Sequence, residues 1–246
     1  GGSSAAAYRR SNVVVANYAS VQRLLASTYG PRPMEKIGYA PETAFYVGDA
    51  HAPVPAELAV LDNPNAPLIV TASRHDPRKG LPVLIEALTL LRNRGVDFRA
   101  CLLGGGPLLA LHRKMVRQAG LGDSVAVTGH IADPADYLRN ADIFVLPSFE
   151  EGSGSMSLLE AMQFGLAPVV SAIDGLVEDI VDGVDGLLVR PGDTHGLANA
   201  LGCIIRNTGF RRELAEAARQ TYDSRFSADR LVSDLGALYE HALAPR

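Results

Sequence analysis

The sequence predicts an α/β protein built on a doubly wound, parallel β-sheet. Between residues 66 and 225, short apolar runs alternate with longer segments whose apolar residues recur every three or four positions. Continuous apolar runs are typical of strands buried on both faces, and the longer segments are typical of amphipathic helices. Because crossovers between parallel strands are right-handed, this alternation places helices on both faces of one sheet.

Length and composition restrict the possible classes of protein. The chain has 246 residues, enough for one large domain and part of another. Hydrophobic residues make up 47% and charged residues 20%, so we expect a soluble, cytoplasmic protein. With a net charge of −4 and no basic run, we expect no nucleic-acid partner. We find no apolar stretch long enough to span a bilayer and no signal peptide.

The first part of the chain is less regular than the rest. Residues 1–7 lack a methionine and look like a linker scar or a cut end, so we leave them out of the fold prediction. A β-branched run at 13–16 predicts a strand, and 18–28 predicts a helix. One strand and one helix cannot bury a core. Residues 39–65 are rich in proline and alanine without periodicity, which indicates an interdomain linker.

From 66 onward the pattern predicts a Rossmann-like domain that ends near 225, followed by a C-terminal helix within 226–246. The expected strands are 68–71, 98–103, 125–127, 143–146, 168–170 and 187–189. The expected helices are 81–91, 108–119, 134–139, 157–164, 176–181, 194–206, 210–222 and 228–243. Ligands of such sheets bind beyond the carboxyl ends of the strands, so the loops that follow strands are the candidate site.

The most informative loop follows the strand at 143–146. It contains two carboxylates, glycines and serines, and it leads into an apolar helix that includes Glu160. Glycines let the backbone approach a ligand, and free N–H groups at a helix start attract anions. Carboxylates suit ribose or sugar hydroxyls, so the combination predicts a nucleotide-sugar site. Glu160 in a core-facing helix needs a partner, which is either a ribose diol or nearby backbone.

Three other loops carry weaker signals. Arg74 and Lys79 flank a turn where two cations can reach a pyrophosphate, although a solvated loop would show the same residues. Three glycines around Gly105 open a helix, as a phosphate loop or a plain tight turn would. His130 and Ile131 follow a strand, where main-chain groups could border a base, although a lone histidine is usually structural.

Cysteines and histidines give no sign of a metal site. Cys101 and Cys203 are either a disulfide or two buried, reduced thiols, and we expect the second. The six histidines form no cluster with metal-ligand spacing.

Taken together, these features resemble the group 1, or family 4, retaining glycosyltransferases of the GT-B fold, from about residue 11 to 243. The stretches that match the family's motifs are 73–80 with G-R-L-x-x-x-K-G, 103–107 with hydrophobic-G-x-G-P, 128–130 with F-x-G, 141–148 with A-D-x-F-V-x-P-S, and 151–162 with E-G-F-G-x-x-x-x-E-A-M. The last motif carries one extra residue between Glu151 and Glu160, and Ser153 stands where the family has an aromatic residue, so Glu150 is an alternative to Glu151.

The resemblance implies a role for each matching residue. Arg74 and Lys79 would hold the donor diphosphate and stabilise the leaving charge, with no divalent metal needed there. Glu151 would bind sugar hydroxyls and Glu160 the ribose. The remaining predicted contacts are with the sugar, phosphate and base: Gly105, His130, Ile131, Gly154, Ser155 and Met156. The donor would be a UDP- or GDP-linked sugar, transferred with retention.

The resemblance also implies a missing part. Residues 1–38 would be the remnant of an N-terminal acceptor domain, so we expect the chain to bind a nucleotide-sugar without transferring the sugar by itself. We expect the surface left by that domain to favour self-association, and the missing domain to contact a membrane surface. The alternatives are a non-catalytic nucleotide-binding or interaction module, and an epimerase. An epimerase would need a dinucleotide fingerprint and a Tyr-x-x-x-Lys pair, which the sequence lacks.

Overall fold

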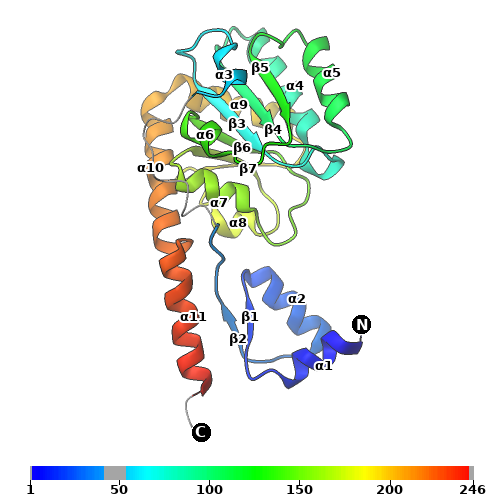
Figure 1. Ribbon diagram of the computed structural model, residues 1–246, viewed down its shortest axis with the longest axis vertical. Coiled ribbons are helices and arrows are strands. Elements are labelled where there is room, and N and C mark those ends of the chain that lie inside the picture. The colour runs from blue at the N-terminus through cyan, green and yellow to red at the C-terminus, as the bar shows by residue number, and fades with distance from the viewer. Residues whose placement is uncertain (1, 42–53, 244–246) are drawn as a thin grey trace.

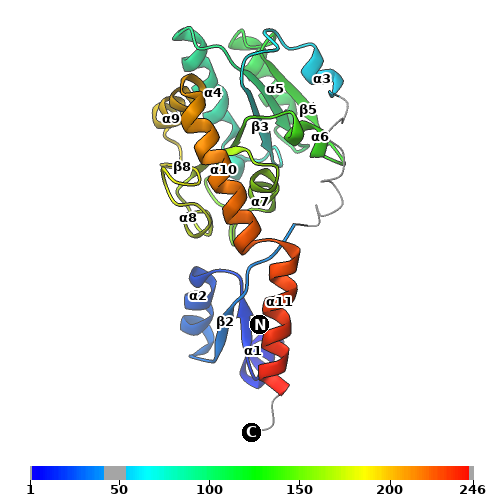
Figure 2. The ribbon, with the colours of Figure 1, turned by 90° about the vertical axis from the view of Figure 1, so that its left-hand side faces the viewer.

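The computed structural model describes residues 2–41 and 54–243, and it has two parts. Figure 1 shows a sheet domain covered by helices and, beyond it, a smaller N-terminal unit drawn in blue. The last helix, α11 (Ala228–Leu243), leaves the sheet domain and runs alongside the N-terminal unit, as the view in Figure 2 also shows. A groove between α11 and β2 (Met34–Lys36) lies where the two meet.

The sheet domain contains the predicted doubly wound parallel sheet. Its strands are β3 (Leu68–Ala72), β4 (Arg99–Leu103), β5 (Val125–Gly129), β6 (Ile143–Leu146), β7 (Ala167–Ser171) and β8 (Leu187–Val189). Their spatial order is β5-β4-β3-β6-β7-β8, and all neighbours are parallel. The fold class predicted from the sequence is confirmed. The chain reverses its direction of travel across the sheet between β3 and β6, so this pair is the topological switch point.

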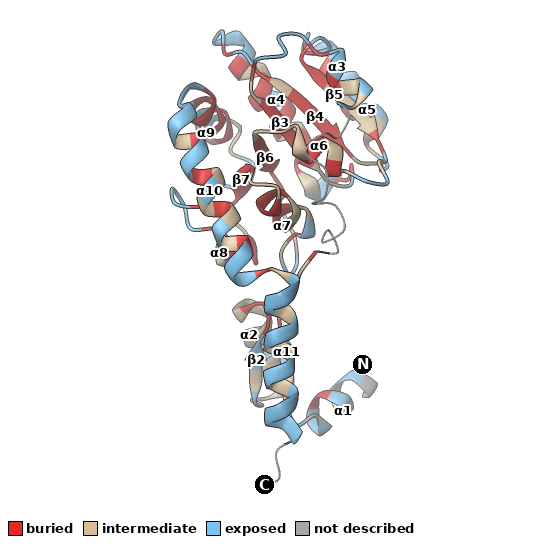
Figure 3. Ribbon diagram, turned by 60° about the vertical axis from the view of Figure 1, so that its left-hand side comes forward, coloured by how far each residue is buried: buried red, intermediate tan, exposed pale blue. Residues whose placement is uncertain are grey.

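Two apolar cores, one on each face, explain the continuous apolar strands. In β3, Ile69 packs into one core while Leu68 and Val70 pack into the other, and none is more than 1% exposed. The first face is covered mainly by α4 (Leu81–Asn93), α5 (Leu109–Gln118) and α9 (Thr194–Arg206). The second is covered mainly by α6 (Ala135–Arg139), α7 (Met156–Gln163) and α8 (Leu176–Asp179), while α10 (Thr208–Arg225) contributes to both. Figure 3 shows the buried residues concentrated between these layers.

The N-terminal unit is larger than the sequence pattern indicated. It consists of α1 (Gly2–Arg10), β1 (Val14–Ala16), α2 (Ala19–Tyr29) and β2. The strand β2 pairs in parallel with β1, and its sequence Met-Glu-Lys has no apolar run that could have predicted it. Residues 2–7, set aside as a scar, belong to a helix. Tyr8 anchors this helix by donating a hydrogen bond to the Gly30 carbonyl oxygen at 2.8 Å.

Two smaller expectations also need adjustment. Within the stretch interpreted as a linker, α3 (Ala56–Ala59) forms a short helix that buries Leu58, while residues 42–53 lie outside the described part of the chain. Cys101 is a buried free thiol, as expected, but Cys203 is exposed on the outer side of α9. Its position within a mostly apolar helix had suggested burial. No helix in the described residues is both long and apolar enough to cross a membrane.

The two loops at the switch point touch at Gly80. Its φ is +63°, and a Cβ placed there would lie 1.9 Å from the carbonyl oxygen of Pro147. Gly95 has almost the same φ, +66°, but a Cβ there would meet no atom within 4 Å. Gly80 therefore permits a close approach of the loops after β3 and β6 as well as a left-handed turn.

These two glycines give a matched test of that contact. Replacing either by alanine should cost about 1–2 kcal/mol for the left-handed backbone. Gly80→Ala should lose roughly a further 1–3 kcal/mol, because the added methyl group must push the two loops apart. Urea unfolding of both variants measures the difference, and equal losses would contradict the close-contact interpretation.

Candidate functional site

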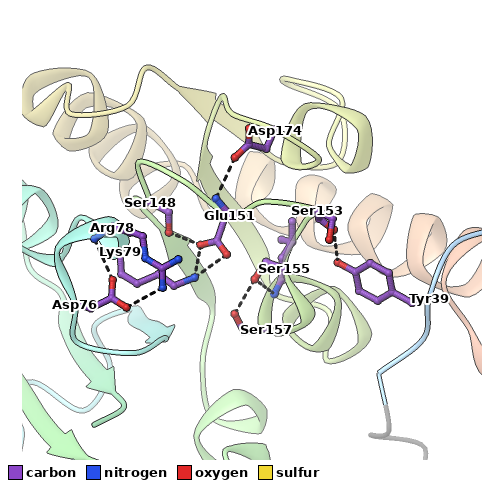
Figure 4. Close-up of polar contacts among 11 residues, drawn as sticks. Tyr39, Asp76, Arg78, Lys79, Ser148, Glu151, Ser153, Ser155, Ser157 and Asp174 are labelled. Carbon is purple, nitrogen blue, oxygen red and sulfur yellow. Dashed lines mark hydrogen bonds and ion pairs between the residues drawn. The ribbon is translucent and has the colours of Figure 1, made fainter. Parts of the chain in front are cut away.

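The loops that follow β3 and β6 meet at the switch point and carry an ion pair. Lys79 ends the 3₁₀ turn η2 (Pro77–Lys79) and places its Nζ 2.7 Å from both carboxylate oxygens of Glu151 (Figure 4). The hydroxyl of Ser148 also donates to this carboxylate, and the Phe149 amide donates to the Arg78 carbonyl oxygen at 2.7 Å. The contact is thus made by side chains and backbone together.

The Lys79–Glu151 pair is shielded from water. The exposed fractions of the two side chains are 19% and 5%. Removing one partner would leave a buried charge without its counterion, which is strongly destabilising. An ammonium has three N–H donors, so Lys79 can serve an anionic ligand while it holds Glu151. The two residues predicted to act on diphosphate and sugar are therefore direct neighbours.

A pocket of about 480 Å³ opens beyond the carboxyl ends of β3, β4 and β5. Its lining includes four of the residues predicted to bind the donor: Arg74, Gly105, His130 and Ile131. They come from three separate loops, which the parallel sheet brings to one edge. The volume is within the range of small-molecule sites. This is the largest convergence of predicted site residues in the described part of the chain.

The glycines of the loop after β4 serve contacts between loops. A Cβ on Gly104 would lie 1.9 Å from the Ser73 carbonyl oxygen, and one on Gly106 would lie 2.5 Å from the His75 carbonyl oxygen. The amide of His75 in turn donates to the Gly105 carbonyl oxygen at 2.8 Å. The loop after β4 and residues 73–75 must therefore approach each other closely along their backbones. This contact fixes the position of the segment that contains Arg74.

Beneath this pocket lies a pair of histidines that sequence reasoning missed. His75 and His112 are both fully buried, and their Nδ1 atoms lie 3.0 Å apart. Each Nε2 atom has no hydrogen-bond partner within the described residues. Burial, followed by the influence of His112 and Arg113, lowers the pKa of His75 to about 4. Burial also lowers the pKa of His112, and the contact between the two Nδ1 atoms requires one ring to donate while the other accepts. No pattern marks two histidines 37 positions apart as neighbours.

Glu160 lies on α7 beside the pocket and is not part of its lining. Burial raises the pKa of its carboxyl group, and the charge of Asp133 raises it further. Asp133 immediately precedes Pro134, which does line the pocket. The Glu160 carboxyl group thus lies within electrostatic reach of Asp133, which is next to a residue of the pocket wall.

The remaining predicted residues form the start of α7. Gly154 has φ +89°, Ser155 caps the helix through a hydrogen bond from the Leu158 amide to its Oγ at 3.4 Å, and Met156 is the first helical residue. The side chain of Ser155 is therefore occupied with capping, while the first N–H groups of the helix are available for other acceptors. The predicted residues thus form three groups, which are the pocket, the ion pair and this helix start, while Glu160 lies further along α7.

Glu178 has a partner that the sequence did not indicate. Its carboxylate accepts hydrogen bonds from the amides of Ala19 and Ser20, at 2.9 and 3.0 Å, which open α2 in the N-terminal unit. Lys36 Nζ also donates to it, at 2.8 Å. Burial acts against these bonds, but they prevail and lower the pKa of Glu178 to about 2.

Comparison with known proteins identifies the family. The model for the glycosyl transferases group 1 matches residues 59–221. The chain belongs to this family. Its sheet domain is the C-terminal half of a GT-B fold, as the resemblance had implied.

Two curated relatives of this chain illustrate the range of the family. It is 32% identical over 180 residues to a lipopolysaccharide core biosynthesis glycosyltransferase, LpsE, from Rhizobium meliloti, which covers 73% of the chain and 52% of LpsE. It is 32% identical over 187 residues to the putative colanic acid biosynthesis glycosyltransferase WcaL from Escherichia coli, which covers 72% of the chain and 46% of WcaL. The chain therefore spans about half the length of these relatives.

Solved structures match the whole arrangement, N-terminal unit included. Sucrose-phosphate synthase from Thermosynechococcus elongatus superposes with a TM-score of 0.81 at 25% identity, over 98% of this chain and 61% of that one. Anabaena Alr3699/HepE, solved in complex with UDP, superposes with a TM-score of 0.82 at 22% identity, over 96% of this chain and 65% of that one.

The buried histidine pair predicts a specific loss of stability in acid. The unfolded chain binds a proton near the ordinary histidine pKa of 6.5, whereas buried His75 does so only near 4. The free energy of unfolding should therefore fall as pH drops through this interval, by roughly 1.4 kcal/mol per pH unit for one such group. Urea unfolding of the wild type and of His75→Asn measures this slope, which should be shallower in the variant.

A control separates this effect from other titrations. His195 is exposed on α9, so His195→Asn should leave the slope unchanged. Burial raises the pKa of Asp179 to about 6, so its contribution runs in the opposite direction and is common to all three proteins. Identical slopes in wild type and His75→Asn would contradict the assignment.

Proposed function

We propose that this chain is the donor-binding half of a retaining glycosyltransferase, which moves a sugar from a UDP- or GDP-linked donor to an acceptor. The observation that carries the proposal is the convergence of the Arg74 pocket, the Lys79–Glu151 pair and the start of α7 at one edge of the sheet. The titles of the Anabaena HepE structures record complexes with UDP and with UDP-glucose, which supports a nucleotide-sugar ligand.

The diphosphate would lie between the two cations. Arg74 offers a planar fork of donors and Lys79 a compact charge, which suits an anion that gains charge as the sugar leaves. The base would lie in the pocket against Gly105, His130 and Ile131. With two cations at the diphosphate, this arrangement needs no divalent metal there.

The hydroxyl groups of the donor would be bound by the two glutamates. Glu160, beside the pocket, would accept hydrogen bonds from the ribose. Glu151 would accept from the sugar while Lys79 and Ser148 hold its carboxylate in place. The N–H groups from Gly154 to Met156 would meet the sugar and the phosphate, since a helix start favours negative charge.

Transfer itself would need a further part. In the described residues, β1 and β2 form a two-stranded parallel sheet with no other neighbour. Parallel sheets normally have more strands and covered faces, and a two-stranded sheet is marginal alone. The chain also spans about half of its relatives. We therefore propose that an N-terminal acceptor domain extends this sheet, and that the chain alone binds the donor without transferring the sugar.

The surface left for that domain includes α11, where no residue is buried. Val232, Tyr239 and Leu243 on this helix are 69%, 63% and 80% exposed. Apolar side chains of this kind favour association, so we propose that the isolated chain self-associates.

Arginine variants test the diphosphate assignment. Arg74→Ala should weaken binding of UDP or GDP by about 1–3 kcal/mol, which is the effect of losing a charge-assisted hydrogen bond. Arg78 is the matched control. It lies four residues away, is mostly exposed and is paired with Asp76, so Arg78→Ala should retain wild-type affinity. Calorimetry with both nucleotides measures the difference. Equal effects of the two variants would contradict the assignment, and absence of binding to wild type would contradict the function.

A deoxynucleotide tests the ribose assignment. If Glu160 binds the ribose hydroxyls, wild type should prefer UDP to 2′-deoxy-UDP, or GDP to its deoxy form, and Glu160→Ala should abolish this preference. Exposed Glu150 provides the control, because Glu150→Ala should keep the preference. A preference that survives in Glu160→Ala would show that another residue binds the ribose. Transfer by the isolated chain would refute the proposal that it is inactive alone.

A further inference from the structure

A buried tyrosine joins the N-terminal unit to the sheet domain. Tyr18 precedes the first turn of α2 and is 2% exposed. Its hydroxyl donates a hydrogen bond to Asp179 Oδ2, on α8, at 2.7 Å. The hydroxyl of Tyr39 lies 3.1 Å from that of Tyr18. The rings of the two tyrosines meet edge to face, with centroids 6.0 Å apart.

The ring of Tyr18 is wedged between two loops of the candidate site. A Cβ on Gly154 would lie 1.9 Å from the Tyr18 hydroxyl, and a Cβ on Gly175 would lie 2.8 Å from the Tyr18 ring. Gly154 belongs to the loop after β6, and Gly175 to the loop after β7. Because neither glycine has a side chain, the two loops leave enough room for the Tyr18 ring.

Two more side chains of the N-terminal segment reach the same loop. The Tyr39 hydroxyl donates a hydrogen bond to the Ser153 carbonyl oxygen (Figure 4). The distance is 3.2 Å, and Asn17 Nδ2 donates to the same oxygen at 3.4 Å. Three side chains thus converge on residues 153 and 154, directly before the cap of α7.

The position of Tyr18 is itself fixed by the sheet domain. The Glu178 carboxylate accepts from the first two amides of α2 and from Lys36, so the start of α2 is anchored on α8. Arg225 donates to the carbonyl oxygens of Glu178 and Asp179, at 2.7 and 3.3 Å, from the other side. Because Tyr18 is fixed at this position, a shift of the N-terminal unit would move its ring and therefore the loop that the ring contacts.

We propose that Tyr18 is a positioning residue that sets the conformation of loop 152–155 and thereby the fit of the transferred sugar. This inference rests on the proposed function, because that function assigns the N–H groups from Gly154 to Met156 to the sugar and phosphate. It adds a physical link between the N-terminal unit and donor binding. Movement of the N-terminal unit relative to the sheet domain would change the contacts with the sugar of the donor more than the contacts with its base.

The test compares ligands that reach different distances into the site. The variant Tyr18→Leu removes the ring that supports the loop. It should lower the affinity for UDP-glucose at least five-fold in calorimetry. The affinity for UMP, whose base and first phosphate would lie toward the Arg74 pocket, should change less than two-fold. GDP-mannose and GMP form the corresponding pair if guanine is the preferred base. Tyr18→Phe keeps the ring in place and should recover most of the lost affinity.

Tyr8 supplies a matched control. It is also a buried tyrosine of the N-terminal unit, 8% exposed, and its hydroxyl bonds to Gly30, away from the loop. Tyr8→Leu should therefore loosen the packing of α1 within the unit without changing the ratio of the two affinities. The inference is overturned if Tyr18→Leu weakens UMP and UDP-glucose equally, or if Tyr8→Leu changes the ratio as much.

Amide hydrogen exchange provides a readout that needs no ligand. In Tyr18→Leu the amides of 152–156 should exchange faster, while those of 104–106, which line the Arg74 pocket, should not change. If wild type binds neither nucleotide-sugar, the proposed donor function fails, and the exchange rates still decide whether Tyr18 orders the loop. Unchanged exchange at 152–156 would overturn the positioning role by itself.

Discussion

The close approach of the loops after β3 and β6 is the constraint on which the site depends. After β3 and after β6 the chain continues toward opposite edges of the sheet, which opens a crevice at the carboxyl ends of these two strands. Gly80 lets the two loops touch at the base of this crevice. The Lys79–Glu151 pair then joins them across a region that water scarcely reaches. Because each charge needs the other when buried, this pair holds a cation and a carboxylate side by side at one edge of the sheet.

A second set of backbone contacts supports the other wall. Gly104 and Gly106 lie against the segment that contains Arg74, and the His75–His112 pair fills the space behind it. The two glycines line the pocket, whereas neither histidine does. These residues bring Arg74 to the same pocket as His130 and Ile131, although the loop after β3 carries the first and the loop after β5 carries the other two. Rigid support of this kind keeps charged groups directed at a small volume without the entropy cost of ordering them at each binding event.

The N-terminal unit is small and lies against the loop that leads into α7. Its contacts with the sheet domain fall on the loop before α7 and on the two carboxylates of α8. The carboxylate of Glu178 caps a helix that belongs to the other part of the molecule, and Tyr18 occupies space left by two glycines. Donor-side loops and the N-terminal unit therefore form one packed region, in which a shift of one requires a shift of the other.

Much of the fold was predictable from the sequence because its signals are local. Strand β6, β8 and helix α9 have the predicted bounds, since apolar runs buried on both faces and amphipathic periods are visible in a short window. Motif order likewise indicated the family and the candidate residues. Tertiary structure decided the rest: β2, which pairs through its backbone without an apolar run; the burial of His75 against His112; and the reach of Glu178 to α2. Each of these features depends on which distant segments become neighbours in the folded chain. The spacing of residues along the sequence does not indicate which segments these are.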